Sequence, residues 1–442
     1  MTTAKITAIA LAATAFVFSP LSAAQEPLRV ALQQEPGTLN PVIGTLAIET
    51  DAANLLFDGL FRRDDQGNLV PDLATRVPTR QNGDISRDGL LIRYHLVHNA
   101  RWSDGEPVTS DDVQFTFSAI MDPRNNVVTR LPYDQFERVD APDPYTVAIH
   151  LKQPFAPALV TTFNDGIQGA IVPAHLLRGV ADFNRAPFGT MPVGSGPYKL
   201  VSWHHGSDMI FEANPTYHRG APKIARIVWR FVPAENSILA GLRSHEIDLV
   251  DKLGVVPYSQ LGHVPGLLPA LSSSMGWEHL TFNTSRGALR DVRVRRALCE
   301  GFDVREIYAK VIHGIGDLGV ALEHPKSPWY DRSLKPCPFD PNHAKALLEQ
   351  AGWRVGSSGV RMKDGVPLQI TFSTVAGIID REQTEVLLQS HWRELGVELQ
   401  SKNYPPSTFF APVQAGGILN GGKFDVALGA FLFASTDPFR EN

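Results

Sequence analysis

The sequence predicts a mixed α/β fold, because short strand-like runs and capped helical segments alternate along most of the chain. The strand-like runs are apolar and rich in β-branched and aromatic residues, and they cover residues 147–151, 227–231, 368–372 and 397–401. The chain has 442 residues, enough for roughly three domains. It contains no internal repeat, low-complexity run or heptad array. These observations indicate several packed α/β units.

The first long element signals lie between residues 69 and 123. Residues 92–96 alternate apolar and polar side chains, the period of a strand with one buried face. Asp104 with the following glycine predicts a tight turn. Thr109 with Asp112 forms a capping-box variant that opens a helix with an apolar face. Trp102 and Asp104 therefore fit a hairpin better than a ligand contact.

Helices in the second half carry clear start and stop signals. Asp303 begins a capping box, and Asp340, followed by proline, starts another helix that ends at Gly352. A third helix is expected over residues 381–395 and stops at Gly396, since glycine accepts the left-handed conformation of a helix end.

The first 24 residues predict an export signal peptide. Lys5 precedes an apolar run over residues 6–18, and Ser22 and Ala24 supply the small residues of a cleavage site. The run is too short for a transmembrane helix, which needs about 20 apolar residues. No cysteine follows the cleavage site to carry a lipid anchor, so we expect a periplasmic protein.

Composition is that of an ordinary globular chain, with 43% hydrophobic residues, 20% charged residues and a net charge of −5. No basic patch favours nucleic acid. The two cysteines leave two interpretations open. Cys299 and Cys337 can form a disulfide if their backbones approach closely in an oxidising compartment. Cys299 also lies in a helical stretch, where a small buried hydrophobe is typical.

Signatures of catalysis and metal binding are absent from the sequence. The turn around Ser195 reads VGSGPY and lacks the G-x-S-x-G spacing of a nucleophile elbow. There is no H-E-x-x-H, phosphate-binding loop or paired-cysteine zinc motif. His204 and His205 are adjacent on a strand-like run, so their side chains point to opposite faces. We therefore expect no enzyme activity, no metal site and no cofactor.

The ordered motifs along the chain resemble one family, the extracytoplasmic solute-binding proteins of oligopeptide-type ABC importers (family 5). The resemblance rests on these segments in this order: TLNP at 38–41, FDGL at 57–60, PDLA at 71–74, WSDG at 102–105, VTSDDV at 108–113, VGSGPY at 193–198, NPTY at 214–217, RSHEID at 243–248, FNT at 282–284 and DVRVRRAL at 291–298. Both the content and the order of the segments carry the resemblance.

The resemblance implies a two-lobed periplasmic binding protein fold of type II with an inserted subdomain in the first lobe. It divides the chain into the signal peptide 1–24, the first lobe over 25–61 and 191–285, the inserted subdomain 62–190 and the second lobe 286–442. In this family the chain normally returns from the second lobe to finish the first. The sequence stops at Asn442 before such a return, so we expect a C-terminally truncated chain with exposed apolar surface and poor solubility.

The resemblance also implies where a solute would bind. Peptide-binding members hold the peptide amino terminus with an aspartate in a W-x-x-D pattern just before an acidic-proline pair, because a buried ammonium needs a carboxylate partner. Aligning on the Asp-Pro pair at 437–438 puts Phe431 at the tryptophan and Ala434 at the aspartate. The missing carboxylate therefore favours a neutral, anionic or modified solute over a peptide with a free amino terminus. Further binding candidates are Thr45, Trp277, Tyr404 and Asn420.

We therefore expect a monomeric, non-enzymatic periplasmic receptor that captures a peptide or peptide-like small solute between its lobes. It would deliver the solute to the transmembrane subunits of an ABC permease. Two alternatives are a ligand-sensing partner of a membrane receptor and a non-functional truncated remnant. Fold-level resemblance does not fix the solute.

Overall fold

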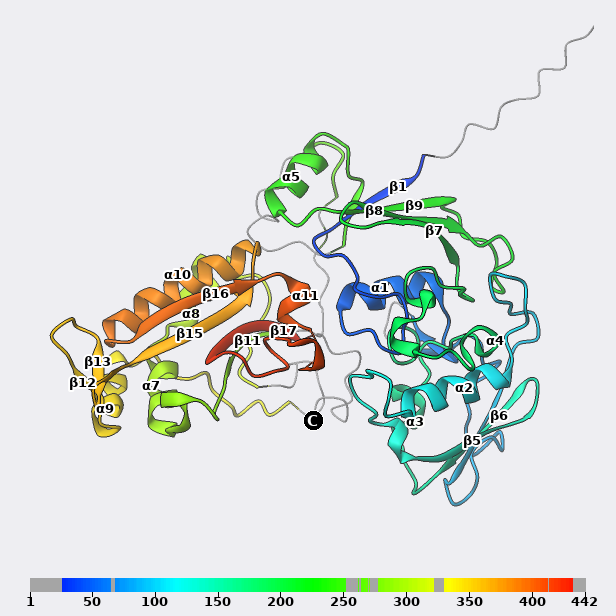
Figure 1. Cartoon of the computed structure of the whole chain (residues 1–442), viewed down its shortest axis with the longest axis horizontal. Coiled ribbons are helices and arrows are strands. Elements are labelled where there is room, and N and C mark those ends of the chain that lie inside the picture. The colour runs from blue at the N-terminus through cyan, green and yellow to red at the C-terminus, as the bar shows by residue number, and fades with distance from the viewer. Residues whose placement is uncertain are drawn as a thin grey trace, which may run out of the picture.

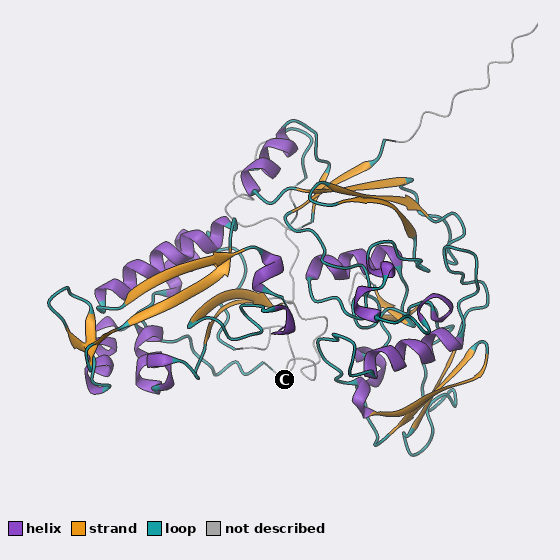
Figure 2. Cartoon of the chain, in the orientation of Figure 1, coloured by secondary structure: helices purple, strands orange, loops and turns teal. Residues whose placement is uncertain are grey.

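The computed structural model describes residues 26–64, 68–251, 261, 264–268, 270, 277–321, 330–411 and 413–431. These residues form two bodies (Figure 1). The first body holds the N-terminal half of the chain, drawn from blue to green, and the second holds the yellow to red segments. Helices and strands alternate in both bodies (Figure 2), which confirms the predicted α/β class.

The centre of the first body is a five-stranded sheet with the order β10-β1-β9-β8-β7. Its strands are β1 (Leu28–Leu32), β7 (Tyr198–His204), β8 (Asp208–Ala213), β9 (Arg226–Phe231) and β10 (Leu249–Val250). Strand β1 pairs in parallel with β9 and β10, whereas β7, β8 and β9 are antiparallel neighbours. Two helices, α1 (Ala47–Leu56) and α5 (Glu235–Arg243), bury their apolar faces in the clusters around this sheet.

A smaller unit lies between β1 and β7 in the sequence. It contains the hairpin β2–β3 (Phe61–Arg63, Leu69–Pro71) and a sheet of order β4-β6-β5, with β4 at Leu91–His95, β5 at Phe136–Asp143 and β6 at Thr146–Leu151. Helix α2 (Ser110–Met121) packs on this sheet, and the short helices α3 (Ala158–Thr161) and α4 (Ala174–Leu177) follow. The cores of this unit and of the five-stranded sheet belong to one cluster.

The local signals predicted in this unit are present. Asp112 accepts a hydrogen bond from the Thr109 backbone N–H at 2.8 Å, which completes the predicted cap of α2. The indole Nε1 of Trp102 donates to the same carboxylate at 3.3 Å, and the Trp102 ring is buried. Trp102 is therefore a scaffold residue, as the sequence indicated.

The second body is built on a four-stranded sheet of order β11-β17-β15-β16. These strands are β11 (Trp277–Phe282), β15 (Gln369–Val375), β16 (Glu398–Tyr404) and β17 (Val426–Phe431). Around them lie α7 (Val292–Glu300), α8 (Val304–Lys310), α9 (Pro341–Gln350), α10 (Ile379–Glu394), α11 (Pro406–Phe409) and the small sheet β12–β14 (Arg354–Val355, Arg361–Lys363, Val366–Pro367). Asp303 and Asp340 are the N-caps of α8 and α9, as expected.

The boundary expected at residues 285–286 falls after β11, a strand of the second-body sheet. The family motif at 282–284 therefore begins with Phe282, the last residue of that strand. Strand pairing with β17, which lies more than a hundred residues further along, decides this assignment.

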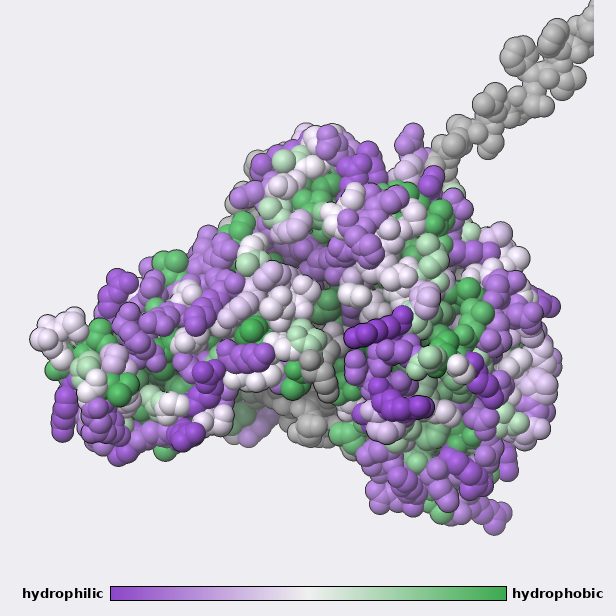
Figure 3. Space-filling view, in the orientation of Figure 1, coloured by the Kyte–Doolittle hydropathy of each residue, from purple (hydrophilic) through white to green (hydrophobic). Residues whose placement is uncertain are grey.

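On the face drawn in Figure 3, hydrophobic side chains form small groups between hydrophilic ones. None of the helices in the described ranges is long and apolar enough to cross a membrane.

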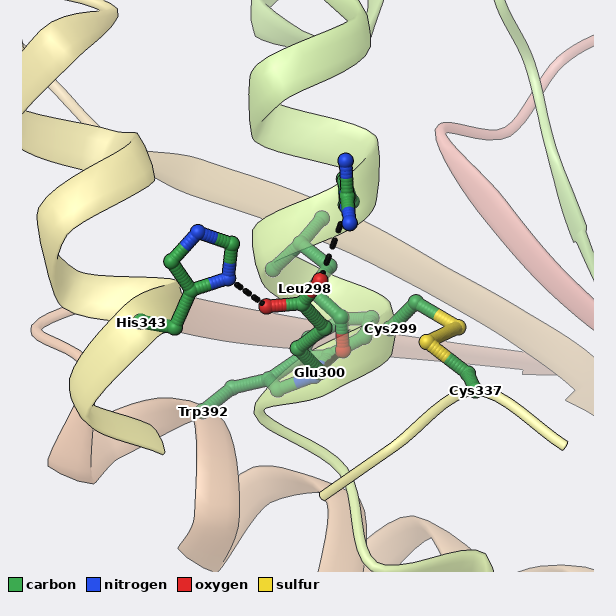
Figure 4. The surroundings of a disulfide bond; sticks show 7 residues. Leu298, Cys299, Glu300, Cys337, His343 and Trp392 are labelled. Atoms are coloured by element: carbon green, nitrogen blue, oxygen red, sulfur yellow. Dashed lines mark hydrogen bonds and ion pairs between the residues drawn. A yellow bond between two sulfur atoms is a disulfide. The ribbon is translucent and has the colours of Figure 1, made fainter. Parts of the chain in front are cut away.

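The two cysteines form a disulfide in this structure (Figure 4). Cys299 lies near the end of α7, and Cys337 lies in the segment leading to α9; their Cα atoms are 6.2 Å apart. Beside them, the buried Glu300 carboxylate contacts His343 of α9 and Arg296 of α7. The disulfide and the Glu300–His343 contact both hold α9 against α7.

Replacing both Cys299 and Cys337 with serine should lower the free energy of unfolding by about 4 kcal/mol, because the crosslink closes a loop between residues 38 positions apart. Urea denaturation with and without reductant measures the effect. The double variant, which cannot respond to reductant, is the control. Two titratable thiols in the unreduced, unfolded wild-type protein would contradict the crosslink.

Candidate ligand-binding site

One face of the second-body sheet carries two of the predicted binding residues, Trp277 and Tyr404. Helices α7, α9 and α10 cover the opposite face, where Phe372, Val426 and Leu428 are buried. Strand register pairs Trp277 of β11 with Phe431 of β17 and places Tyr404 of β16 on the same side as Trp277, three strands away. The side chain of Val375, which pairs with Tyr404, packs into a separate small cluster on this side. The sequence candidates Trp277 and Tyr404 therefore share one sheet face, and Phe431 is the strand partner of Trp277.

The side chain of Trp277 has an indole N–H that can donate a hydrogen bond. Its ring stacks on His279 with centroids 4.2 Å apart and an interplanar angle of 16°. Its Nε1 atom is buried and has no hydrogen-bond partner among the described residues. Burial lowers the pKa of His279, which favours the neutral imidazole in this stack. An aromatic ring with one available N–H can bind a small solute by stacking and by one hydrogen bond to an acceptor group.

Arg381 is a buried cation on the opposite face of the same sheet, and no sequence motif indicates it. It lies in the first turn of α10, and its Nε donates to Glu278 of β11 at 2.6 Å. Glu278 follows Trp277 in the chain, so its side chain points to the face opposite the Trp277 ring. The charged run around residue 381 resembles an ordinary solvated helix start, and only the contact with β11 distinguishes it.

The two bodies meet next to this arginine. Glu235, the first residue of α5, is buried and accepts hydrogen bonds from Gln33 Nε2 at 2.9 Å and from the backbone N–H of Ile379 at 3.2 Å. Ile379 begins α10, so a carboxylate of the first body lies at the positive end of a long helix of the second. Phe410, which follows α11, packs against core clusters of both bodies. The candidate surface thus adjoins the junction.

Thr45 belongs to the first body, in a loop organised by one carboxylate. Glu49 is buried and accepts backbone N–H bonds from Gly37, Thr38, Thr45 and Leu46 at 2.5–3.1 Å. These four bonds fix the path of residues 37–46 ahead of α1. Thr45 is half-buried, and its part in binding stays a prediction.

The remaining candidates are Asn420 and Ala434. The Asn420 side chain donates to the carbonyls of Phe410 and Ala411 at 3.0 and 3.1 Å, so its amide closes its own loop. Ala434 lies outside the described residues, and its role stays a prediction. The described part of β17 ends at Phe431.

The remaining polar motifs have scaffold contacts. His204 contacts Asp208 and His205 contacts Glu35, so the two imidazoles separate as strand geometry predicts. Ser195 is buried, and its hydroxyl accepts the N–H of Asp58 at 3.0 Å. A Cβ on Gly194 would lie 1.8 Å from the carbonyl oxygen of Leu56, so this turn needs glycine for close packing. Over the described ranges, no group of three histidine, cysteine or acidic side chains could hold a metal ion.

The fold and the surface at the junction define a two-bodied binding protein. Residues 68–440 match the family model described as "Bacterial extracellular solute-binding proteins, family 5 Middle". The chain belongs to this family of solute-binding proteins, as the motif order indicated.

Relatives with known names or structures agree. The chain is 30% identical to Protein XP55 of Streptomyces lividans over 85% of its own length and 66% of that protein, and 26% identical to the oligopeptide-binding protein AppA of Bacillus subtilis over 83% and 67%. The chain thus spans about two thirds of the length of these relatives. The structure of NikZ from Campylobacter jejuni in complex with Ni(L-His) superposes with a TM-score of 0.81 at 26% identity, covering 94% of this chain and 79% of that one.

Replacing Glu235 with alanine should increase the mean separation of the two bodies, because the N-terminus of α10 loses its carboxylate partner across the junction. Spectroscopic distance measurement between labels on α5 and α9, without added solute, reports this separation. The control is Glu382→Ala, which removes a carboxylate that contacts Gly377 within the second body. Equal distance distributions for wild type and Glu235→Ala would contradict the assignment.

Proposed function

We propose that this chain is the solute-binding receptor of an ABC importer, exported to the periplasm by its N-terminal signal without a lipid anchor. It captures a peptide or peptide-like small solute at the junction of its two bodies and delivers it to the transmembrane subunits of a permease. The observation that carries the proposal is the buried Nε1 of Trp277, which has no hydrogen-bond partner among the described residues and lies on a sheet face shared with Tyr404, in a chain of this family. Closure of two bodies around a solute is a hinge motion known for periplasmic binding proteins.

The chemistry of the surface supports binding by shape and by a few polar contacts. Trp277 offers an aromatic face and one N–H donor. Relatives of this chain include an oligopeptide-binding protein and a nickel-binding protein, so peptides and metal complexes are the first solutes to try.

Native mass spectrometry of the protein, purified from a periplasm without refolding, tests the receptor function. We expect a narrow charge distribution and an additional mass that dissociates on activation, because a closed receptor retains its solute. A broad, highly charged distribution without bound mass would contradict a folded receptor in this chain.

Recognition should not depend on a free amino terminus, because alanine stands at position 434 where peptide-binding members have aspartate. For short peptides that bind, N-acetylation should change Kd by less than about tenfold, or ~1.4 kcal/mol. Calorimetric titration of paired free and acetylated peptides measures this. The matched variant Ala434→Asp should gain a preference for the free amine, and a strong loss of wild-type binding on acetylation would refute the prediction.

A further inference from the structure

Two carboxyl groups and one histidine are buried together in the first body, away from the surface that bears Trp277. Asp58 follows the end of α1, Asp72 follows β3, and His218 lies between β8 and β9. Their side chains are 2%, 4% and 3% exposed, respectively. The ring atom Nδ1 of His218 is 3.8 Å from Oδ2 of Asp58, and Nε2 is 3.3 Å from Oδ1 of Asp72. The imidazole therefore lies between two acids.

Only some of the polar atoms in this cluster have hydrogen-bond partners among the described residues. The hydroxyl of Tyr217 donates to Oδ1 of Asp58 at 3.0 Å. Oδ2 of Asp58 and both ring nitrogens of His218 are buried without a hydrogen-bond partner among the described residues. Groups in that condition are rare in folded proteins and need a physical explanation. A proton on Asp58 would remove the charge from its unsatisfied oxygen.

The net charge of the cluster and its neighbours favours binding of one proton. Arg219 lies 3.5 Å from Asp72 and balances that carboxylate from the partly exposed side. The next charged neighbours are Arg63, at the end of β2, and Asp165, whose pKa is raised by burial. With Asp72 and Arg219 paired, an ionised Asp58 would place a second carboxylate charge in this buried cluster, which is costly.

The position of Asp58 adds to that cost. Phe57 is the C-cap of α1, so Asp58 follows the negative end of the helix dipole. Burial, and then the nearby Asp72 carboxylate, raise the pKa of Asp58 from 3.8 to about 7. The same surroundings raise the pKa of Tyr217, so its phenol stays a neutral donor.

We propose that Asp58, with His218 and Asp72 around it, is a buried proton-binding site that keeps one proton in the folded protein up to neutral pH. The site ties together three segments: the exit of α1, the exit of β3 and the 214–219 loop. Asn99 of the smaller unit donates to the carbonyl of His218 at 3.2 Å, so this loop also contacts that unit. Loss of the proton leaves a buried charge at the joint and destabilises the contact.

The direction of the pH effect follows from linkage. Between about pH 4 and about pH 7 the folded chain keeps the Asp58 proton, whereas an unfolded aspartate has already lost it. The contribution of Asp58 to stability is therefore greatest at low pH and declines as pH rises through this window. Most paired carboxylates in the chain act in the opposite direction, as Asp248 does beside Arg29.

The test compares thermal unfolding of the wild type and Asp58→Asn from about pH 5 to about pH 8. Asparagine imitates the protonated acid, so Tm of the variant should rise relative to the wild type as pH increases. The control is Asp248→Asn, which makes the same chemical change in the same body at a carboxyl that stays ionised over this range. Its Tm difference from the wild type should be constant with pH. A constant difference for Asp58→Asn as well would overturn the proposal.

A second measurement needs no variant. In protein with ¹³C-labelled aspartate carboxyls, one carboxyl resonance of the folded wild type should titrate with a midpoint near neutral pH. Its absence from the Asp58→Asn spectrum assigns it. If every aspartate carboxyl of the folded wild type titrates below about pH 5, Asp58 is ionised at neutral pH and the proposal is wrong. Neither measurement requires a solute, so the result is independent of the receptor function.

Discussion

The first body depends on the parallel pairing of β1 with β9, which joins residues 28–32 to residues 227–231. Nearly all of the first half of the chain, including the β4-β6-β5 unit, lies between these strands in the sequence. Closing so long a loop costs little more than closing one of moderate length, because loop entropy grows only logarithmically. Packing contacts with the sheet must nevertheless hold this long intervening segment in one orientation. Glycines 194 and 196 allow the returning chain to pack directly on the end of α1.

The candidate site follows from a second pairing, of β11 with β17. This antiparallel ladder pairs Trp277 with Phe431 and directs the Trp277 side chain to the sheet face that lacks the large helices. Alternation along a strand then places Glu278 on the other side, where Arg381 at the start of α10 reaches it. An aromatic surface and a cation therefore lie on the two sides of one edge strand, next to the Glu235 contact between the bodies. An aromatic residue, an ion pair and a helix-end contact are each common in proteins, and the strand order brings these three close together.

Local features of this fold were predictable from the sequence, whereas features set by distant partners were not. The Thr109–Asp112 cap and the caps at Asp303 and Asp340 involve residues close in the chain, so the residue types indicate them directly. The place of β11 depends on a partner strand far along the chain, so no local motif indicates it. The candidate residues show the same limit. The contact of Arg381 with Glu278 depends on where α10 packs on the sheet, and the bonds of the Asn420 amide to two carbonyls depend on the path of its loop.

The two buried carboxylates of the α1 region show why burial alone does not decide ionisation. Glu49 lies in the first turn of α1 and accepts four backbone N–H bonds at the positive end of the helix dipole. Asp58 lies just beyond the other end, where the dipole opposes a negative charge and a second acid is close. Its oxygens receive the Tyr217 hydroxyl, and one of them has no described hydrogen-bond partner. A carboxylate stabilised by N–H donors can organise a loop as an anion, whereas one with this second environment lowers its cost by holding a proton. The same short helix thus places one carboxylate with four N–H donors beside the predicted binding loop and one titratable acid at the joint behind it.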